Sequence, residues 1–119
     1  MPNQTSDWLP DLQSQYLSRA DKKLAELSHA LESFIAKPKD VACERRLRNL
    51  LHNIIGSGGS FGFARITEAA RGLASVVKES RKQRWPIGDQ TAKALRAGLE
   101  KVREAFGKAM AEREPKAEG

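Results

Sequence analysis

The sequence predicts an all-α protein, an antiparallel up-down-up-down bundle of four helices. In four separate stretches of the 119-residue chain, apolar residues recur at spacings of three and four, which is the period of an amphipathic helix. No stretch of four to eight residues alternates β-branched or aromatic residues with polar ones, so the sequence offers no candidate strand. The connections between the four stretches are short, and short connections make neighbouring helices antiparallel.

The first two predicted helices occupy the first half of the chain. Helix one covers residues 17–35 and is stopped by Lys37-Pro38-Lys39. Before it, we expect Asp7-Trp8-Leu9-Pro10 to form a short helix, a lid or an extra turn at one end of the bundle. Helix two begins near Asp40, whose carboxylate is a suitable N-cap. Its apolar face is formed by Leu47, Leu50, Leu51 and Ile54.

The third and fourth predicted helices follow a cluster of glycines at residues 56–62. Helix three ends in the basic run 78–84. Its apolar face is formed by Ile66, Ala69, Ala70, Leu73, Val76 and Val77. Helix four has Asp89 as its N-cap. Its apolar face is formed by Ala92, Leu95, Leu99, Val102, Phe106 and Met110. We therefore expect one helical domain over residues 1–111 and a charged tail or linker over 112–119.

The composition excludes several classes of protein. A net charge of +6 suits a nucleic acid, an anionic membrane or an acidic protein partner. Aromatic residues make up only 6% of the chain, too few for base stacking, so we expect no nucleic-acid partner. No apolar run approaches the roughly 18 residues of a membrane span, and the first residues do not form a secretory signal, so we expect a cytoplasmic protein without a membrane partner. The single cysteine, Cys43, and two histidines leave no evident metal site, and we expect no cofactor.

His52 is the candidate functional residue of the second helix. On a helical wheel that starts at Leu47, the core residues fall within about 60° of zero, whereas His52 lies at about 140°. If the helix continues through the glycines, the same outward face carries Arg48 at about 100°, Gly59 at about 120°, Arg45 at about 160° and Gly56 at about 180°. The imidazole therefore faces solvent, flanked by cations and by residues without a side chain.

The four glycines at positions 56, 58, 59 and 62 need a physical reason, because a glycine inside a helix costs about 1 kcal/mol relative to alanine. One interpretation is a flexible turn between the second and third helices. The other is close approach by a second protein, for which Gly56 and Gly59 leave a flat shelf beside the exposed histidine. Nucleotide-binding loops do not fit, because a GxGxxG pattern meets Phe61 and no Gly-Lys-Ser/Thr occurs.

Residues 51–63 carry a specific pattern, Leu-His-Asn-Ile-Ile-Gly-Ser-Gly-Gly-Ser-Phe-Gly-Phe. Glycine follows His52 after four, seven and ten residues, and an apolar residue follows the last glycine. This pattern resembles the signature of histidine phosphotransfer (HPt) domains, in particular the phosphoacceptor domain of chemotaxis histidine kinases. The likeness continues at Ile66, Arg71 and Leu73. The resemblance implies a four-helix bundle in which His52 accepts a phosphoryl group and Gly56 and Gly59 support docking of the partner.

Two positions depart from the family pattern. The family usually has lysine three residues after the histidine, near the phosphoryl group, where this chain has Ile55. The position 22 residues after the histidine is commonly acidic and can steady the imidazole, but here it is Ala74. On the wheel, Arg48 lies one turn before His52 and can supply a cation, with Arg45 farther along.

The implied function is that of a phosphocarrier without its own ATP-binding or kinase domain. A neutral imidazole can attack an aspartyl phosphate, and the resemblance implies that the aspartate and the Mg²⁺ come from a partner. That partner is the receiver domain of a response regulator or hybrid kinase, with a histidine kinase as a further candidate, and a cationic face suits the receiver's acidic pocket. Because of Ile55 and Ala74, the alternative is a degenerate bundle that docks partners or dimerises without carrying phosphate. The second histidine, His29, lies opposite the apolar face of its helix and is interpreted as an ordinary surface residue.

Overall fold

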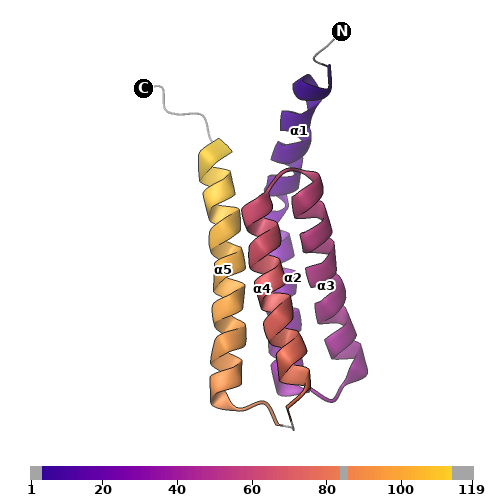
Figure 1. Ribbon diagram of the computed structural model, residues 1–119. Coiled ribbons are helices and arrows are strands. Elements are labelled where there is room, and N and C mark those ends of the chain that lie inside the picture. Colours follow the sequence, from indigo (N-terminus) through magenta and orange to yellow (C-terminus); the bar gives the residue numbers. More distant parts are fainter. Residues whose placement is uncertain (1–3, 84–85, 114–119) are drawn as a thin grey trace.

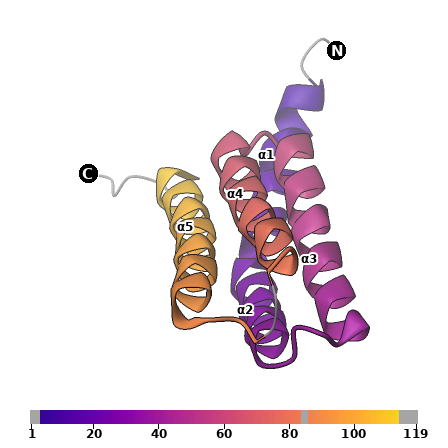
Figure 2. The ribbon, with the colours of Figure 1, turned by 60° about the horizontal axis from the view of Figure 1, so that its bottom comes forward.

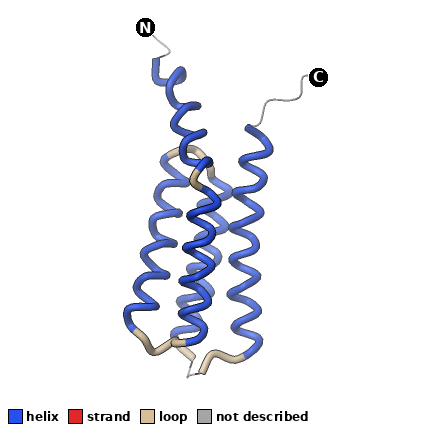
Figure 3. Tube along the Cα trace, turned by 180° about the vertical axis from the view of Figure 1, so that it is seen from behind, coloured by secondary structure: helices blue, strands red, loops and turns tan. Residues whose placement is uncertain are grey.

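The computed structural model describes residues 4–83 and 86–113, and every regular element within them is a helix. The helices are α1 (Gln4–Ser18), α2 (Ala20–Ala36), α3 (Val41–Ser60), α4 (Ala64–Arg81) and α5 (Asp89–Arg113). Figure 3 shows these helices joined by short loops, with no strand in the part of the chain that is described. The prediction of an all-α fold is confirmed.

Helices α2 to α5 lie side by side, and α1 extends beyond one end of the group (Figure 1). α3 packs against α2 and α4, and α5 packs against α4 and α2, so the four helices surround one core. From α2 onward the connections alternate between the two ends, and α3, α4 and α5 each run opposite to the helix before them. Figure 2 shows α4 between α3 and α5, which leaves the outer sides of α3 and α4 open to solvent.

The core is formed by the inward faces of these four helices. The largest fully buried side chains are Phe34, Phe106, Leu27, Leu31, Leu47, Leu51, Ile66, Leu73, Leu95, Val77 and Val102. They follow the three-and-four spacing of the sequence, because that spacing places them on one face of each helix. Some members of the predicted faces are only partly buried, and these are Ile35, Leu50, Ala69, Val76 and Met110.

The first predicted helix is divided in the structure, so its prediction as a single element over residues 17–35 is wrong at its start. α1 already covers residues 4–18, and the chain bends at Arg19 before α2 begins. At the bend, the Arg19 amide donates to the Tyr16 carbonyl over three residues (3.2 Å) instead of four. The predicted short N-terminal element is therefore a helix of 15 residues.

Contacts with distant parts of the chain hold α1 in place, although Pro10 inside it removes one intrahelical hydrogen bond. Gln13 Nε2 donates to the carbonyl of Phe61, in the turn after α3 (2.7 Å). Arg113, at the end of α5, donates to the Pro10 carbonyl and to Gln13 Oε1 (2.9 Å each). Tyr16 stacks in an aromatic group with Phe61, Phe63 and Phe106. The N-terminal helix therefore depends on tertiary contacts more than on its own sequence.

Two helix starts can be compared with the predicted caps. The Asp40 carboxylate accepts hydrogen bonds from the amides of Ala42 (2.9 Å) and Cys43 (3.2 Å), so the predicted N-cap of α3 is confirmed. At α5, the carbonyl of Gly88 accepts from the amide of Ala92 (2.9 Å), so the cap lies at Gly88 and Asp89 is the first helical residue. The prediction of Asp89 as N-cap is wrong by one position.

α5 continues to Arg113, two residues past the expected end of the domain at residue 111. Glu112 forms an ion pair with Arg65 of α4 (3.0 Å), and Arg113 binds α1. These side chains fix the end of the helix against its neighbours. The rest of the predicted tail, residues 114–119, lies outside the described residues.

Candidate functional site

An open hollow with a volume of about 390 Å³ lies between α3 and α4, and we call it the α3–α4 groove. From α3 it is lined by Arg48, Asn49, Leu51, His52 and Ile55. From α4 it is lined by Ala74, Val77, Lys78 and Arg81. Leu51 and Val77 are buried and form an apolar floor, whereas the histidine and the cations are exposed along the rim.

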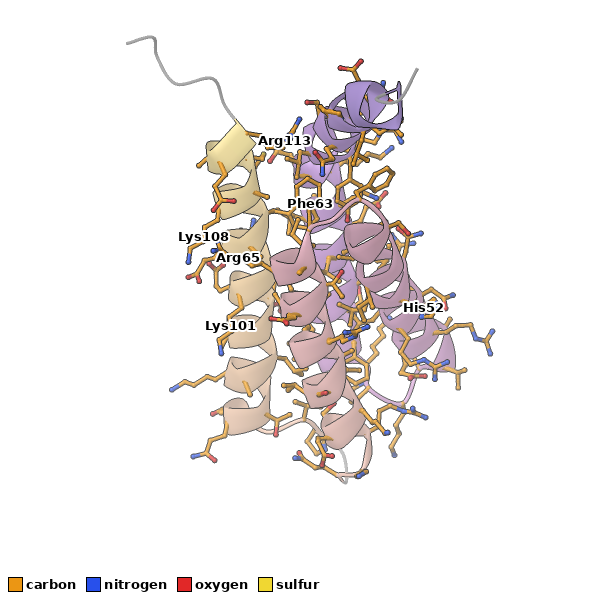
Figure 4. The ribbon with its side chains drawn as sticks, turned by 45° about the horizontal axis from the view of Figure 1, so that its top comes forward. His52, Phe63, Arg65, Lys101, Lys108 and Arg113 are labelled. Atoms are coloured by element: carbon orange, nitrogen blue, oxygen red, sulfur yellow. The ribbon has the colours of Figure 1, made fainter. Side chains whose placement is uncertain are left out.

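His52 lies on the outward side of α3, as the helical wheel predicts. Its side chain is exposed, and Figure 4 shows it on the side of the bundle away from α5. Within residues 4–83 and 86–113, His52 makes no hydrogen bond or ion pair. The unprotonated nitrogen of a neutral imidazole is therefore available to a group that arrives from solvent.

The structure brings Arg48 to the same groove but not Arg45. Arg48 lies one turn before His52 and forms an ion pair with Glu44 (Nη1 to Oε2, 3.2 Å). Arg45 instead lines a separate, shallower hollow on the outer side of α3, together with Arg46 and neighbouring residues. Of the two cations that the sequence suggested near the histidine, only Arg48 shares the groove.

The glycine cluster is mainly helical, so the interpretation of residues 56–62 as a flexible turn is wrong. α3 continues through Gly56, Gly58 and Gly59 to Ser60, and the reversal into α4 takes only residues 61–63. Gly62 is in the left-handed region (φ 84°), where a side chain would be strained. The helix continues because hydrogen bonds of its last turn and packing on α4 outweigh the low helix propensity of glycine.

The glycines of α3 differ in what surrounds them. A Cβ atom on Gly58 would lie 2.7 Å from Thr67 Oγ1 and 3.3 Å from the Thr67 amide nitrogen, so Gly58 allows α3 and α4 to approach each other closely. At Gly56 a Cβ would meet nothing within 4 Å, and at Gly59 it would meet only Thr67 Oγ1, at an ordinary 3.7 Å. Packing therefore requires Gly58, whereas Gly56 and Gly59 are exposed helical glycines that the fold does not need.

A hydrogen bond joins the glycine segment of α3 to the C-terminal part of α1. Ser57 Oγ donates to the Tyr16 hydroxyl (2.9 Å). Burial raises the pKa of Tyr16 above its usual value of 10, and the hydrogen bond from Ser57 acts in the opposite direction. This contact could not be predicted from the sequence, because the two residues are 41 positions apart.

Four further residues of the α3–α4 groove bear on the expectations from the sequence. Ile55 and Ala74, the two departures from the HPt pattern, lie in the same groove as His52. Lys78 and Arg81 of α4 bring two further cations to the groove, and sequence reasoning missed both. The available signal was that Lys78 stands one helical turn after Ala74, on the face that an antiparallel α4 presents to α3.

Neither a metal-binding cluster nor a membrane-spanning helix occurs among the residues that the structure describes. Residues 4–83 and 86–113 contain no group of three or more His, Cys, Asp or Glu side chains placed to hold a metal ion. None of the helices in this part of the chain combines the length and apolar character needed to cross a bilayer.

Comparison with known proteins gives one match. The family model described as "Hpt domain" matches residues 11–105, which include α2, α3 and α4 completely. No match was found among curated proteins or among solved structures.

Proposed function

The chain belongs to the Hpt domain family, and we propose that it carries a phosphoryl group on His52 between proteins of a two-component phosphorelay. Hpt domains are phosphocarrier modules and not themselves kinases. One observation supports the assignment of His52 as the residue that carries the phosphoryl group. His52 is an exposed imidazole at the rim of a cationic groove, and the next two turns of its helix present glycines that the fold does not require.

The proposed reaction needs one nucleophile from this chain. The unprotonated ring nitrogen of His52 attacks the phosphorus of an aspartyl phosphate on the partner, and a P–N bond forms while the P–O bond to the aspartate breaks. The electron pair of that P–O bond remains on the aspartate as a carboxylate. The proton on the other ring nitrogen can leave to water. The reverse sequence returns the phosphoryl group to an aspartate.

We propose a receiver domain as the partner, from a response regulator or a hybrid kinase. Such a partner would supply the aspartate and bind Mg²⁺, which neutralises charge on the transferred phosphoryl group. Helices α2 to α5 run in alternating directions and form a bundle that exposes His52 on one side. Arg48, Lys78 and Arg81 give this side a positive charge, which speeds association with an acidic pocket and is weakened by salt.

The bare backbone at Gly56 and Gly59 supports docking of that partner. Each exposed glycine costs the helix about 1 kcal/mol relative to alanine, and their own surroundings do not explain the cost. A partner that lies flat on this side of α3 gives a reason, because its aspartate must come within bonding distance of the imidazole. Side chains at these two positions would hold the partner away.

The test is phosphoryl transfer from a panel of phosphorylated receiver domains to the purified chain. We expect acid-labile label on the wild-type protein and on His29→Gln, which removes the other histidine, but none on His52→Gln. All three proteins are expected to have the same helical content and melting temperature, because both histidines are exposed. Label on His52→Gln equal to that on the wild type contradicts the proposal. Receiver binding with no transfer to any form favours a docking bundle that carries no phosphate.

A further inference from the structure

The register between α3 and α4 places Lys78 near His52. Close to one end of this helix pair Gly58 lies against Thr67, and close to the other end Glu44 forms an ion pair with Arg81 (3.3 Å). The two helices are therefore antiparallel and in a constant register. Counting from Glu44 and Arg81 toward each other places His52 level with residues 73 and 74 of α4. Lys78 is about four to five residues farther along α4, which corresponds to about 6 to 7.5 Å along the helix axis.

The direction in which the side chains point brings Lys78 closer to His52. In a helix, side chains tilt toward the N-terminus of their own helix. Because α3 and α4 are antiparallel, His52 leans toward the level of Lys78, and Lys78 leans toward the level of His52. Arg48 leans away from His52, and its ion pair with Glu44, one turn back, shows this direction (3.2 Å).

Ion pairing also distinguishes Lys78 from the two arginines of the groove. The Glu44 carboxylate is largely buried, with 13% of the side chain exposed, and it binds the guanidinium groups of both Arg48 and Arg81. It therefore offsets part of the positive charge of both arginines. Lys78 is exposed and has no ion-pair partner within residues 4–83 and 86–113. Lys78 is thus the groove cation whose charge remains available to an arriving anion.

The shape of the groove fits a phosphoryl group between these side chains. Ala74, one turn before Lys78 on α4, ends at a methyl group and leaves space opposite His52. Ile55 places an aliphatic side chain on the α3 side, so no cation comes from that position. A phosphoryl group on His52 carries about 1.5 to 2 negative charges and three acceptor oxygens, which an ammonium group matches well.

We propose that Lys78 binds the phosphoryl group carried by His52. Lys78 thereby provides, from α4, the positive charge that is absent at position 55 of α3. This inference rests on the proposed function. Lys78 touches the transferred group itself, whereas Glu44 is a positioning residue that holds the two arginines at the end of the groove. The interaction favours the phosphorylated form of the chain over the unphosphorylated form.

The experiment measures the equilibrium constant for phosphoryl exchange between one receiver and this chain, with wild type, Lys78→Ala and Lys82→Ala. The equilibrium between the free proteins does not depend on how tightly they dock, so it reports how each substitution changes the stability of the phosphorylated chain relative to the unphosphorylated chain. Lys82 is the control, because it is an exposed lysine directly after the same helix that is paired with Glu79 and does not line the groove. We expect Lys78→Ala to shift the equilibrium away from phosphorylated His52 by about three- to tenfold. Lys82→Ala is expected to behave as wild type.

Two rescue variants make the assignment specific. Lys78→Arg is expected to restore most of the lost equilibrium constant, and Ile55→Lys in the Lys78→Ala background is expected to restore part of it. An equilibrium constant for Lys78→Ala equal to that of wild type, on a protein that is phosphorylated at His52, overturns the inference and leaves the proposed function intact. Equal losses in Lys78→Ala and Lys82→Ala overturn it too, because they indicate a general effect of charge. A wild-type chain that accepts no phosphoryl group overturns both proposals.

Discussion

Leucine in place of Gly56 is expected to stabilise the protein and at the same time to abolish efficient transfer. Gly56 is an exposed residue inside α3, and a Cβ atom there meets nothing within 4 Å. Leucine has a helix propensity close to that of alanine, so Gly56→Leu gains about 0.8 kcal/mol of folding free energy. For a chain of this size the gain corresponds to a rise of about 3 to 5 °C in melting temperature.

The same side chain stands on the surface that we propose for docking of the partner, one turn from His52. A displacement of about 1 Å between reacting groups can cost about 100-fold in rate, so we expect a loss of that order in transfer from a phosphorylated receiver. The control is Gly107→Leu on α5, where a Cβ also meets nothing within 4 Å and the residue is exposed. It is expected to gain the same stability with an unchanged transfer rate. A Gly56→Leu protein that is folded and transfers at the wild-type rate refutes the proposal that the partner docks on the exposed backbone at Gly56.

Three further outcomes test the account of the fold. Gly58→Ala is expected to lower the stability by about 1 kcal/mol, seen in a denaturant titration, because the cost of overpacking against Thr67 exceeds the gain in helix propensity; an increase in stability would contradict the close approach of α3 and α4. Asp40→Ala is expected to cost about 1 kcal/mol by thermal melting, through loss of the α3 N-cap, and no change would show that the cap is not needed. Tyr16 is the single tyrosine, so its absorbance on ionisation reports its pKa directly, and that pKa is expected above 10 because of burial. Because the unfolded chain loses this proton at lower pH than the folded chain, stability should fall as the pH rises past 10, and Tyr16→Phe should reduce that fall.

The periodic parts of the fold could be predicted because they depend on local pattern. The apolar spacing of α2 to α5 sets which faces are buried, and a carboxylate at Asp40 caps α3 wherever the rest of the chain lies. The break at Arg19 could not be predicted, since the helical pattern continues through it. α1 is positioned by its contacts with Phe61 and Arg113, which are remote from it in the sequence.

For the site, the sequence identified the exposed face but not its neighbours. His52, Arg48 and the open glycines follow from the wheel of one helix. The contribution of α4, including Lys78, depends on the register between two helices, which no single-helix pattern contains. Gly58 falls at about 20° on the same wheel, on the apolar face of α3, whereas the contact with Thr67 that leaves no room for a Cβ atom depends on the packing of α4.

The most direct test of the central claim is to locate the phosphoryl group itself. The chain is phosphorylated by a receiver, digested at neutral or alkaline pH and analysed by tandem mass spectrometry with a fragmentation method that preserves the P–N bond. The account predicts one phosphoryl group on the peptide that contains His52, with fragment ions that place it on this residue, and none on His29. A phosphoryl group on His29 or on any other side chain, with His52 unmodified, would contradict it.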